Sequence, residues 1–167
     1  ALMTGHMSGQ NLVLNGDFEA GNSGFTSTYT FANPNITEGE YSVVTDPHSW
    51  NGACASFGDH TSGSGKMLVA NGNTTSSPVV WSQQVTVSPH QTYFFSTWAA
   101  NISGLAPSTF VFRINGVTLQ PTVALPAQAG LWQSYTTTWD SGASTSALLE
   151  IIFTSTDRLG NDTALDD

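Results

Sequence analysis

Apolar and polar residues alternate along most of this chain with a period of two. In the segment FVFRING, Phe110, Phe112 and Ile114 fall on one side of an extended strand, and Val111 and Arg113 fall on the other. No window of a dozen residues has the apolar period of 3.6 that an amphipathic helix needs. The pattern therefore predicts an all-β protein.

The predicted strands are separated by clusters of Gly, Pro, Asn and Ser, which favour turns. The pair Asn115-Gly116 predicts a tight type I′ hairpin turn, because both residues tolerate a positive φ. Many short strands at this spacing are typical of a jelly-roll β-sandwich of two antiparallel sheets. We predict strands at 11–14, 25–32, 40–45, 66–71, 79–87, 92–100, 109–115, 117–123, 132–139, 146–154 and 163–167.

The length of 167 residues predicts one domain. The opening ALMTGHMSGQ contains GHM, which looks like an expression-tag remnant. We therefore set residues 1–9 aside and expect the domain at 10–167. No apolar run approaches the length of a membrane span, so we expect no membrane insertion.

The charge balance excludes one class of partner. Three Lys and Arg residues stand against twelve Asp and Glu, a net charge of -9, so a nucleic acid partner is not expected. Only 9% of residues are charged, and a surface rich in hydroxyls and amides is common in secreted bacterial domains. Cys54 is the single cysteine, so stability must come from packing or from a bound ion rather than from an intrachain disulfide.

The sequence offers little evidence of a catalytic site. Glu38 and Glu40 share a strand face, but two acids at i and i+2 seldom flank a scissile glycosidic bond from opposite sides. A solvated strand edge is the favoured interpretation. We assign no catalytic residue and expect no enzymatic activity; a small lyase or hydrolase would need an acid/base pair that the sequence does not show.

Four acids lie in predicted loops or strand ends among Gly, Asn and Ser: Asp17, Glu19, Asp59 and Asp166. Calcium binds carboxylates and backbone carbonyls in a flexible shell of six to eight oxygens. If the first and last strands lie side by side, GDFE and LDD would meet at one such site. The alternative is that these acids only cap turns.

The segments NLVLNGDFEAG, GKMLVANG, VVWSQQVTVSPHQTYFFSTW and GNDTALDD resemble the secreted carbohydrate-binding modules of the family 4, 9 and 22 type. The resemblance covers nearly the whole chain from residue 11. It implies a galactose-binding-like β-sandwich with a structural Ca²⁺ that ties the first strand to the last. Its implied ligands are Asp17 by its carbonyl, Glu19, the Gly65 carbonyl and Asp166, with Asp59 an addition from its loop.

In the resembled modules a ligand lies in a cleft on the concave sheet, where aromatic rings stack on sugars and polar groups bind hydroxyls. Trp81 and Gln83 are the first candidates, although Trp81 shares its parity with apolar residues that look buried. Arg113 and Glu150 could reach the same face. Trp50 could stack at the rim or fold over the core, and Tyr29 lies on an early strand that would edge the cleft. Trp98 and Trp132 are expected in the core or on the convex face.

We therefore expect a non-catalytic module that binds a polysaccharide or oligosaccharide and targets an attached glycoside hydrolase or surface protein to it. We expect a secreted, extracellular monomer. The main alternative is a structural or adhesive domain of an exported bacterial surface protein that has the same fold and no glycan site.

Overall fold

The computed structural model describes residues 2–5, 10–75 and 78–167. It confirms an all-β chain, interrupted by one single-turn helix, α1 (Pro47–Trp50). Among the described residues, no helix has the length and apolar character needed to cross a membrane. The strands are β1 (Leu2–Gly5), β2 (Thr30–Phe31), β3 (Glu40–Val44), β4 (Met67–Ala70), β5 (Val79–Thr86), β6 (Thr92–Asn101), β7 (Thr109–Ile114), β8 (Val117–Ala124), β9 (Gln133–Asp140), β10 (Ser146–Phe153) and β11 (Thr163–Asp166).

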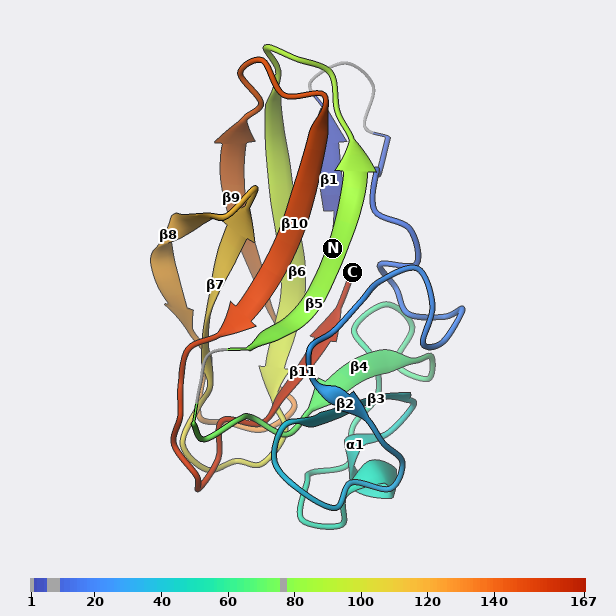
Figure 1. Ribbon diagram of the computed structural model, residues 1–167. Helices are drawn as coiled ribbons and strands as arrows, with labels where there is room; N and C mark the ends of the chain where they lie inside the picture. Colours follow the sequence, from blue (N-terminus) through green and yellow to red (C-terminus); the bar gives the residue numbers. More distant parts are fainter. Residues whose placement is uncertain (1, 6–9, 76–77) are drawn as a thin grey trace.

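The strands form two sheets that face each other (Figure 1). The four-stranded sheet has the order β5-β10-β7-β8. The seven-stranded sheet has the order β1-β6-β11-β4-β3-β2, with β9 on the other edge of β6. All neighbours are antiparallel except β2 and β3. The predicted sandwich of two antiparallel sheets is therefore confirmed.

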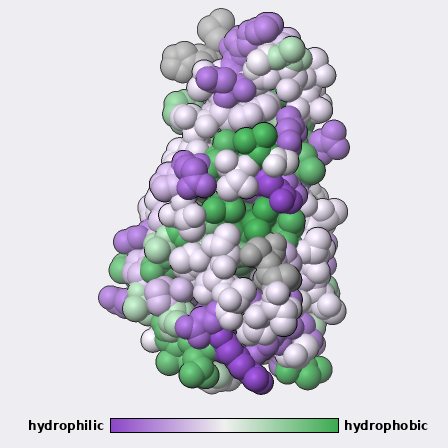
Figure 2. Space-filling view, turned by 60° about the vertical axis from the view of Figure 1, so that its left-hand side comes forward, coloured by the Kyte–Doolittle hydropathy of each residue, from purple (hydrophilic) through white to green (hydrophobic). Residues whose placement is uncertain are grey.

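Alternation along the strands builds the core between the sheets. Phe110, Phe112 and Ile114 are buried in it, whereas Arg113 points away from them, as the sequence predicts. At the side where β8 and β9 lie, partly buried Leu119 packs against the core, and apolar side chains show between more polar ones on that face (Figure 2). Asn115 (φ 49°) and Gly116 (φ 79°) make the expected hairpin turn.

The predicted strand at 11–14 is wrong. Val13 N donates to Asn11 Oδ1 (3.0 Å), which turns the chain locally. Leu14 N donates to Gln83 Oε1 (2.8 Å) and the Gln83 Nε2 donates to Leu14 O (3.0 Å), so a side chain takes the place of a strand partner. Of the predicted strand at 25–32, only β2 and an isolated bridge between Thr26 and Ser82 are formed.

Residues 2–5, which we set aside at the sequence level, form β1 on the edge of β6 opposite Tyr93–Ser96. This position continues the line of β11, which pairs with the other half of β6.

A second apolar cluster lies on the outer face of the seven-stranded sheet, under the segment that contains α1. Trp50, Cys54, Met67 and Ile102 are buried in it. Asp46 caps α1 by accepting a hydrogen bond from His48 N (3.0 Å). The Trp50 indole donates to Ala32 O (2.7 Å), so the ring fixes the loop after β2 as well.

Glu40 organises the loop before β3. Its Oε2 accepts hydrogen bonds from Asn35 Nδ2 (2.8 Å), Ile36 N (2.7 Å) and Thr37 N (3.0 Å). Burial raises the pKa of Glu40, but these hydrogen bonds outweigh burial and hold the pKa below its ordinary value. The interpretation of Glu40 as a solvated edge residue is therefore wrong. Glu38 is only partly buried and pairs with Arg158 (3.2 Å).

Glu40→Gln removes the charge that these three donors surround, so we expect the free energy of unfolding to fall by about 1–3 kcal/mol at neutral pH. Because the folded pKa lies below the unfolded one, this stabilisation is present above the unfolded pKa and is lost as pH falls through the folded pKa. In urea unfolding, the gap between the original chain and the variant should therefore narrow in acid. Glu38→Gln is the control, with an effect below about 0.5 kcal/mol. Equal stability of the Glu40→Gln variant at neutral pH would contradict this role.

Candidate functional site

A row of polar side chains crosses the outer face of the four-stranded sheet. The strand register places Thr118, Arg113, Glu150 and Ser82 opposite one another on β8, β7, β10 and β5. Thr26 continues the row beyond β5, where its Oγ1 lies 2.8 Å from Ser82 Oγ. In Figure 1 this sheet faces the viewer, with β10 between β7 and β5. The face therefore offers hydroxyl, carboxylate and guanidinium groups along one line.

The pair Arg113–Glu150 is the charged centre of the row. Arg113 Nε lies 2.6 Å from Glu150 Oε2 and Arg113 Nη2 lies 2.7 Å from Glu150 Oε1, a bidentate arrangement. The Glu150 side chain is 9% exposed, and that of Arg113 is 32% exposed. The hydrogen bonds to Glu150 raise the pKa of Arg113. The pair is neutral as a whole, and the outer N–H groups of the guanidinium can still donate to a ligand.

A groove of about 440 Å³ adjoins this row along β5. Thr26, Ser82 and Gln84 contribute polar groups, and Leu14 and Leu148 flank them with exposed apolar side chains. A groove that combines apolar walls with a few polar groups matches the general character of small-ligand sites.

Four of the predicted sugar-binding residues are buried, although Gln83 also lines the groove along β5. Trp81 is 1% exposed and packs in the core near Phe95, so its ring cannot stack on a ligand. Gln83 is buried, and its amide is used by Leu14 and by Gly24 O. Tyr29 and Trp50 are also buried, and Trp50 folds over the second apolar cluster rather than standing at a rim.

These four placements are corrections. For Trp81 and Gln83 on β5, period-two alternation shows that they share a face, but only the packing of the second sheet shows that this face is covered. Trp50 lies on α1, and it is buried because that segment packs on the outer face of the seven-stranded sheet. Arg113 and Glu150 are the two predicted residues that the structure places together on an outer face.

Three of the predicted metal ligands, Glu19, Asp59 and Asp166, accept hydrogen bonds from the backbone of the segment at 59–66. Glu19 Oε1 accepts a hydrogen bond from Lys66 N (2.6 Å), and Asp59 Oδ1 accepts one from Gly65 N (2.6 Å). A Cβ on Gly65 would clash with Glu19 Oε1 and would also crowd Asp59. Gly65 is therefore the point at which the two carboxylates approach the same backbone.

Asp166 supplies the buried carboxylate of this group. Its Oδ2 accepts hydrogen bonds from His60 N (2.9 Å), Thr61 N (3.0 Å) and Thr61 Oγ1 (3.0 Å). Its Oδ1 is buried without a hydrogen-bond partner. Burial raises the pKa of Asp166 to about 6, against the hydrogen bonds from Thr61 and together with the charges of Asp167 and Asp59. A buried acceptor of this kind is costly unless a donor or a cation satisfies it.

Burial also raises the pKa of Asp59, but hydrogen bonds from Ser62 and Gly65 outweigh burial and hold the pKa below its ordinary value. Asp17 lies farther out, where its Oδ1 accepts from Glu19 N (3.4 Å) and it lines a depression together with Asp167. Among the described residues, the acidic and imidazole ligand atoms that lie within 4.8 Å of one another belong to His60, Asp166 and Asp167, and Asp17, Glu19 and Asp59 are not brought into this group.

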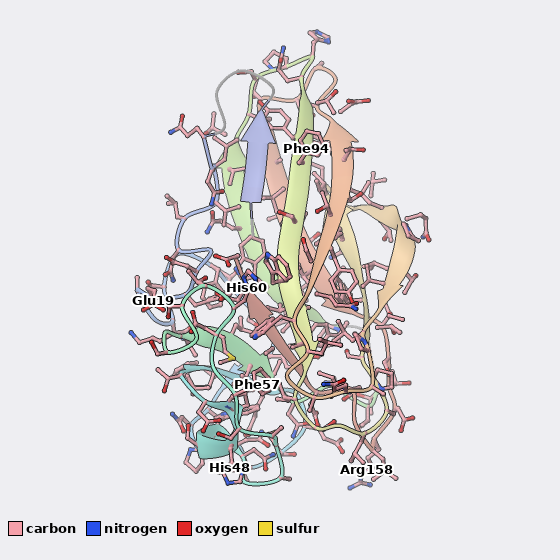
Figure 3. The ribbon with its side chains drawn as sticks, turned by 180° about the vertical axis from the view of Figure 1, so that it is seen from behind. Glu19, His48, Phe57, His60, Phe94 and Arg158 are labelled. Carbon is pink, nitrogen blue, oxygen red and sulfur yellow. The ribbon has the colours of Figure 1, made fainter. Side chains whose placement is uncertain are left out.

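The sequence analysis missed His60. The imidazole stacks on Trp98, with ring centroids 3.7 Å apart, and its Nδ1 lies 2.9 Å from Asp167 Oδ2. Figure 3 shows His60 beside the sheet and Glu19 farther out on the same side. The adjacency of Asp59 and His60 was the only signal in the sequence, because the partners Trp98 and Asp167 are far away along the chain.

Comparison with known proteins shows the fold. No protein-family model matches the sequence, and no curated protein matches it. A family 61 carbohydrate-binding module in complex with β-1,4-galactotriose has 16% identity and a TM-score of 0.60, with 95% of each chain covered. A family 22 xylan-binding domain from Paenibacillus barcinonensis Xyn10C has 17% identity and a TM-score of 0.58, with 90% of this chain and 87% of that chain covered. The chain therefore has the β-sandwich fold of carbohydrate-binding modules.

The same fold occurs within longer chains. The enzymatically active domain of bacteriophage CBA120 tailspike protein 4 has 14% identity and a TM-score of 0.58, with 93% of this chain but 20% of that chain covered. The match to the EclA C-terminal domain, described as a sugar-binding protein, has 18% identity and a TM-score of 0.49 and covers 53% of this chain and 64% of that chain.

Removal of one partner of the Arg113–Glu150 pair leaves a poorly solvated charge on the sheet. We therefore expect Arg113→Ala and Glu150→Ala to destabilise the fold, and the double variant to cost less than the sum, with a coupling energy of about 1–3 kcal/mol. Urea unfolding of the four proteins measures this coupling. The exposed pair Arg158–Glu38 is the matched control, for which we expect a coupling below about 0.5 kcal/mol. Additive effects of Arg113→Ala and Glu150→Ala would contradict the prediction.

Proposed function

We propose that the chain is a non-catalytic carbohydrate-binding module that holds a polysaccharide against the outer face of its four-stranded sheet. The observation that carries the proposal is the polar row centred on Arg113 and Glu150, together with the adjoining groove along β5. Solved structures of the same fold support it, since their descriptions include a xylan-binding domain and a galactotriose complex.

Binding at this face would rest mainly on hydrogen bonds. Sugar hydroxyls can accept from the outer N–H groups of Arg113 and can exchange hydrogen bonds with Ser82 and with the exposed Gln84 amide. Leu14 and Leu148 offer apolar contact to the C–H faces of a sugar ring. The pair Arg113–Glu150 fixes the guanidinium in place before a ligand arrives, so less side-chain freedom is lost on binding.

The proposed role is to bring an attached protein close to a polysaccharide, and not to catalyse a reaction. Both carboxylate oxygens of Glu150 already accept hydrogen bonds from Arg113, and we assign this residue no catalytic role. A module of this kind would concentrate an attached glycoside hydrolase or surface protein on its polysaccharide. We place it outside the cell, as a monomer.

A structural Ca²⁺ belongs to the same proposal. Asp166 Oδ1, buried without a partner, is the atom that most needs a cation, and Glu19, Asp59 and the Gly65 carbonyl would complete its shell. Asp17 would join from the N-terminal segment. When bound, Ca²⁺ would supply positive charge among these carboxylates and tie the N-terminal segment to β11.

The first test is affinity electrophoresis of the purified chain in gels that contain β-glucan, xylan, mannan, galactan, pectin or alginate. We expect one neutral polysaccharide to retard the protein, because the pair Arg113–Glu150 is neutral and the chain carries a net charge of -9. Gln84→Ala and Ser82→Ala change exposed or half-buried groups on the face and should each weaken retardation by roughly three- to tenfold in affinity.

Gln128→Ala, on an exposed loop away from this sheet, is the matched control and should leave retardation unchanged. No retardation by any polysaccharide would overturn the proposal and would favour a structural or adhesive domain. If Gln84→Ala and Ser82→Ala leave the retardation intact, the chain still binds the polysaccharide, but at a site other than this face.

The second test is thermal unfolding with and without a calcium chelator. An ion present at a hundred times its Kd stabilises the fold by about 2.7 kcal/mol, so chelation should lower Tm by about 5–10 °C. In Asp166→Asn the chelator should have little further effect. Asp157→Asn, in an exposed loop, should respond like the original chain. An unchanged Tm of the original chain after chelation would rule the calcium site out.

A further inference from the structure

A second concave site lies at one end of the sandwich, where the turn between β5 and β6 meets the turn between β9 and β10. Two adjoining depressions share His90, Gln91 and Thr92 there. One, of about 440 Å³, continues onto Phe94, and the other, of about 250 Å³, continues onto Asp140. These turns form the upper end of the molecule in Figure 1. The size of the larger depression is in the range of small-ligand sites.

The backbone at this end is held firmly. His90, with φ at 56°, donates its N–H to Gly142 O (2.6 Å), and Ser141 N donates to Gln91 O (2.9 Å). Gln91 N donates to Ser141 Oγ (3.0 Å), and the hydroxyl of Ser141 donates to Ser88 O (2.9 Å). The two turns are therefore locked to each other, and the side chains that project from them are positioned in advance of any ligand.

The side chains on this frame are available for binding. The His90 imidazole and the Gln91 amide are exposed, and they form no hydrogen bond to another residue that the structure describes. Thr92 Oγ1 donates to Asp140 Oδ1 (2.5 Å), which orients the carboxylate at the surface. Phe94 is 40% exposed and stands on the outer face of β6, where Figure 3 shows it near the upper end of the strand.

These groups match the chemistry of a sugar unit. An aromatic face contacts sugar C–H groups, and an amide, an imidazole and a carboxylate can bind hydroxyls. No cation serves the site, because the three basic residues of the chain are engaged elsewhere: Lys66 with Glu19 O, Arg113 with Glu150 and Arg158 with Glu38. A carboxylated or sulfated ligand would therefore find no lysine or arginine at this site and would be repelled by Asp140.

We infer that the end of the sandwich formed by His90, Gln91, Thr92, Phe94 and Asp140 is a second binding site for a neutral saccharide. For its ligand class, this inference rests on the proposed function. Phe94 and Thr92 point outward from the seven-stranded sheet, whereas Arg113 and Glu150 point outward from the four-stranded sheet, so the two sites open on different surfaces. One module can then hold two separate glycan segments, which raises its avidity for a polysaccharide above that of either site.

The test is a titration of the ¹⁵N-labelled chain, followed by amide chemical shifts, with xylotriose, cellotriose, mannotriose and β-1,4-galactotriose as probes. We expect saturable shifts at residues 90–94 and 140–142 in addition to those at 82–84 and 148–150. Phe94→Ala should weaken the first set roughly three- to tenfold and leave the second unchanged. Gln84→Ala should weaken the shifts at 82–84 and 148–150 and leave those at 90–94 and 140–142 unchanged.

Gln91→Ala provides a second variant of the end site at an exposed side chain, and the amide spectrum itself reports whether each variant is folded. Phe94→Leu should bind more weakly than the original chain, because it keeps the apolar contact and removes the aromatic face. Shifts confined to the sheet face, or shifts at 90–94 that neither Phe94→Ala nor Gln91→Ala weakens, would overturn the second site and leave the proposed function in place. No shift with any probe would overturn both.

Discussion

The placement of β11 in the middle of the seven-stranded sheet is the constraint on which the rest of the structure depends. This short strand pairs with β4 on one side and with β6 on the other, and all four of its residues are buried. Without it the sheet would split between β4 and β6, because no other strand among the described residues joins them. The same strand delivers Asp166 to the loop at 59–65, where its carboxylate accepts hydrogen bonds from His60 N and Thr61 N.

Buried carboxylates organise the loops of a chain that has few charges and no disulfide. Glu40 gathers three donors before β3, Asp59 gathers the donors of its own loop, and Asp166 fixes the backbone at His60 and Thr61. Each of these three carboxylates fixes its loop through a few charge-assisted hydrogen bonds. The exception is Asp166 Oδ1, which finds no donor, and this exception is what makes a cation at the cluster physically reasonable.

The small number of charged residues also determines which groups the surface can offer to a ligand. Arg113 and Arg158 each pair with one glutamate and Lys66 binds a backbone carbonyl, so the exposed faces are left with hydroxyls, amides and scattered apolar side chains. Such surfaces favour neutral polyhydroxylated ligands over ionic ones. The polar row on the four-stranded sheet and the pocket at the end of the sandwich are two arrangements of these groups, one held by strand register and the other by interlocked turns.

The sequence by itself determined the strands from β3 to β11, because period-two alternation and turn residues are local signals. It also determined that Arg113 points away from Phe112 and Ile114. Only the tertiary structure decided which strand faces are covered. It therefore decided that Trp81 lies in the core and that Arg113 pairs with Glu150. It alone brought His60 to Asp166 and Gln83 to Leu14, 106 and 69 residues apart. Contacts of this separation leave no local pattern in a single sequence, because they arise from how the sheets pack.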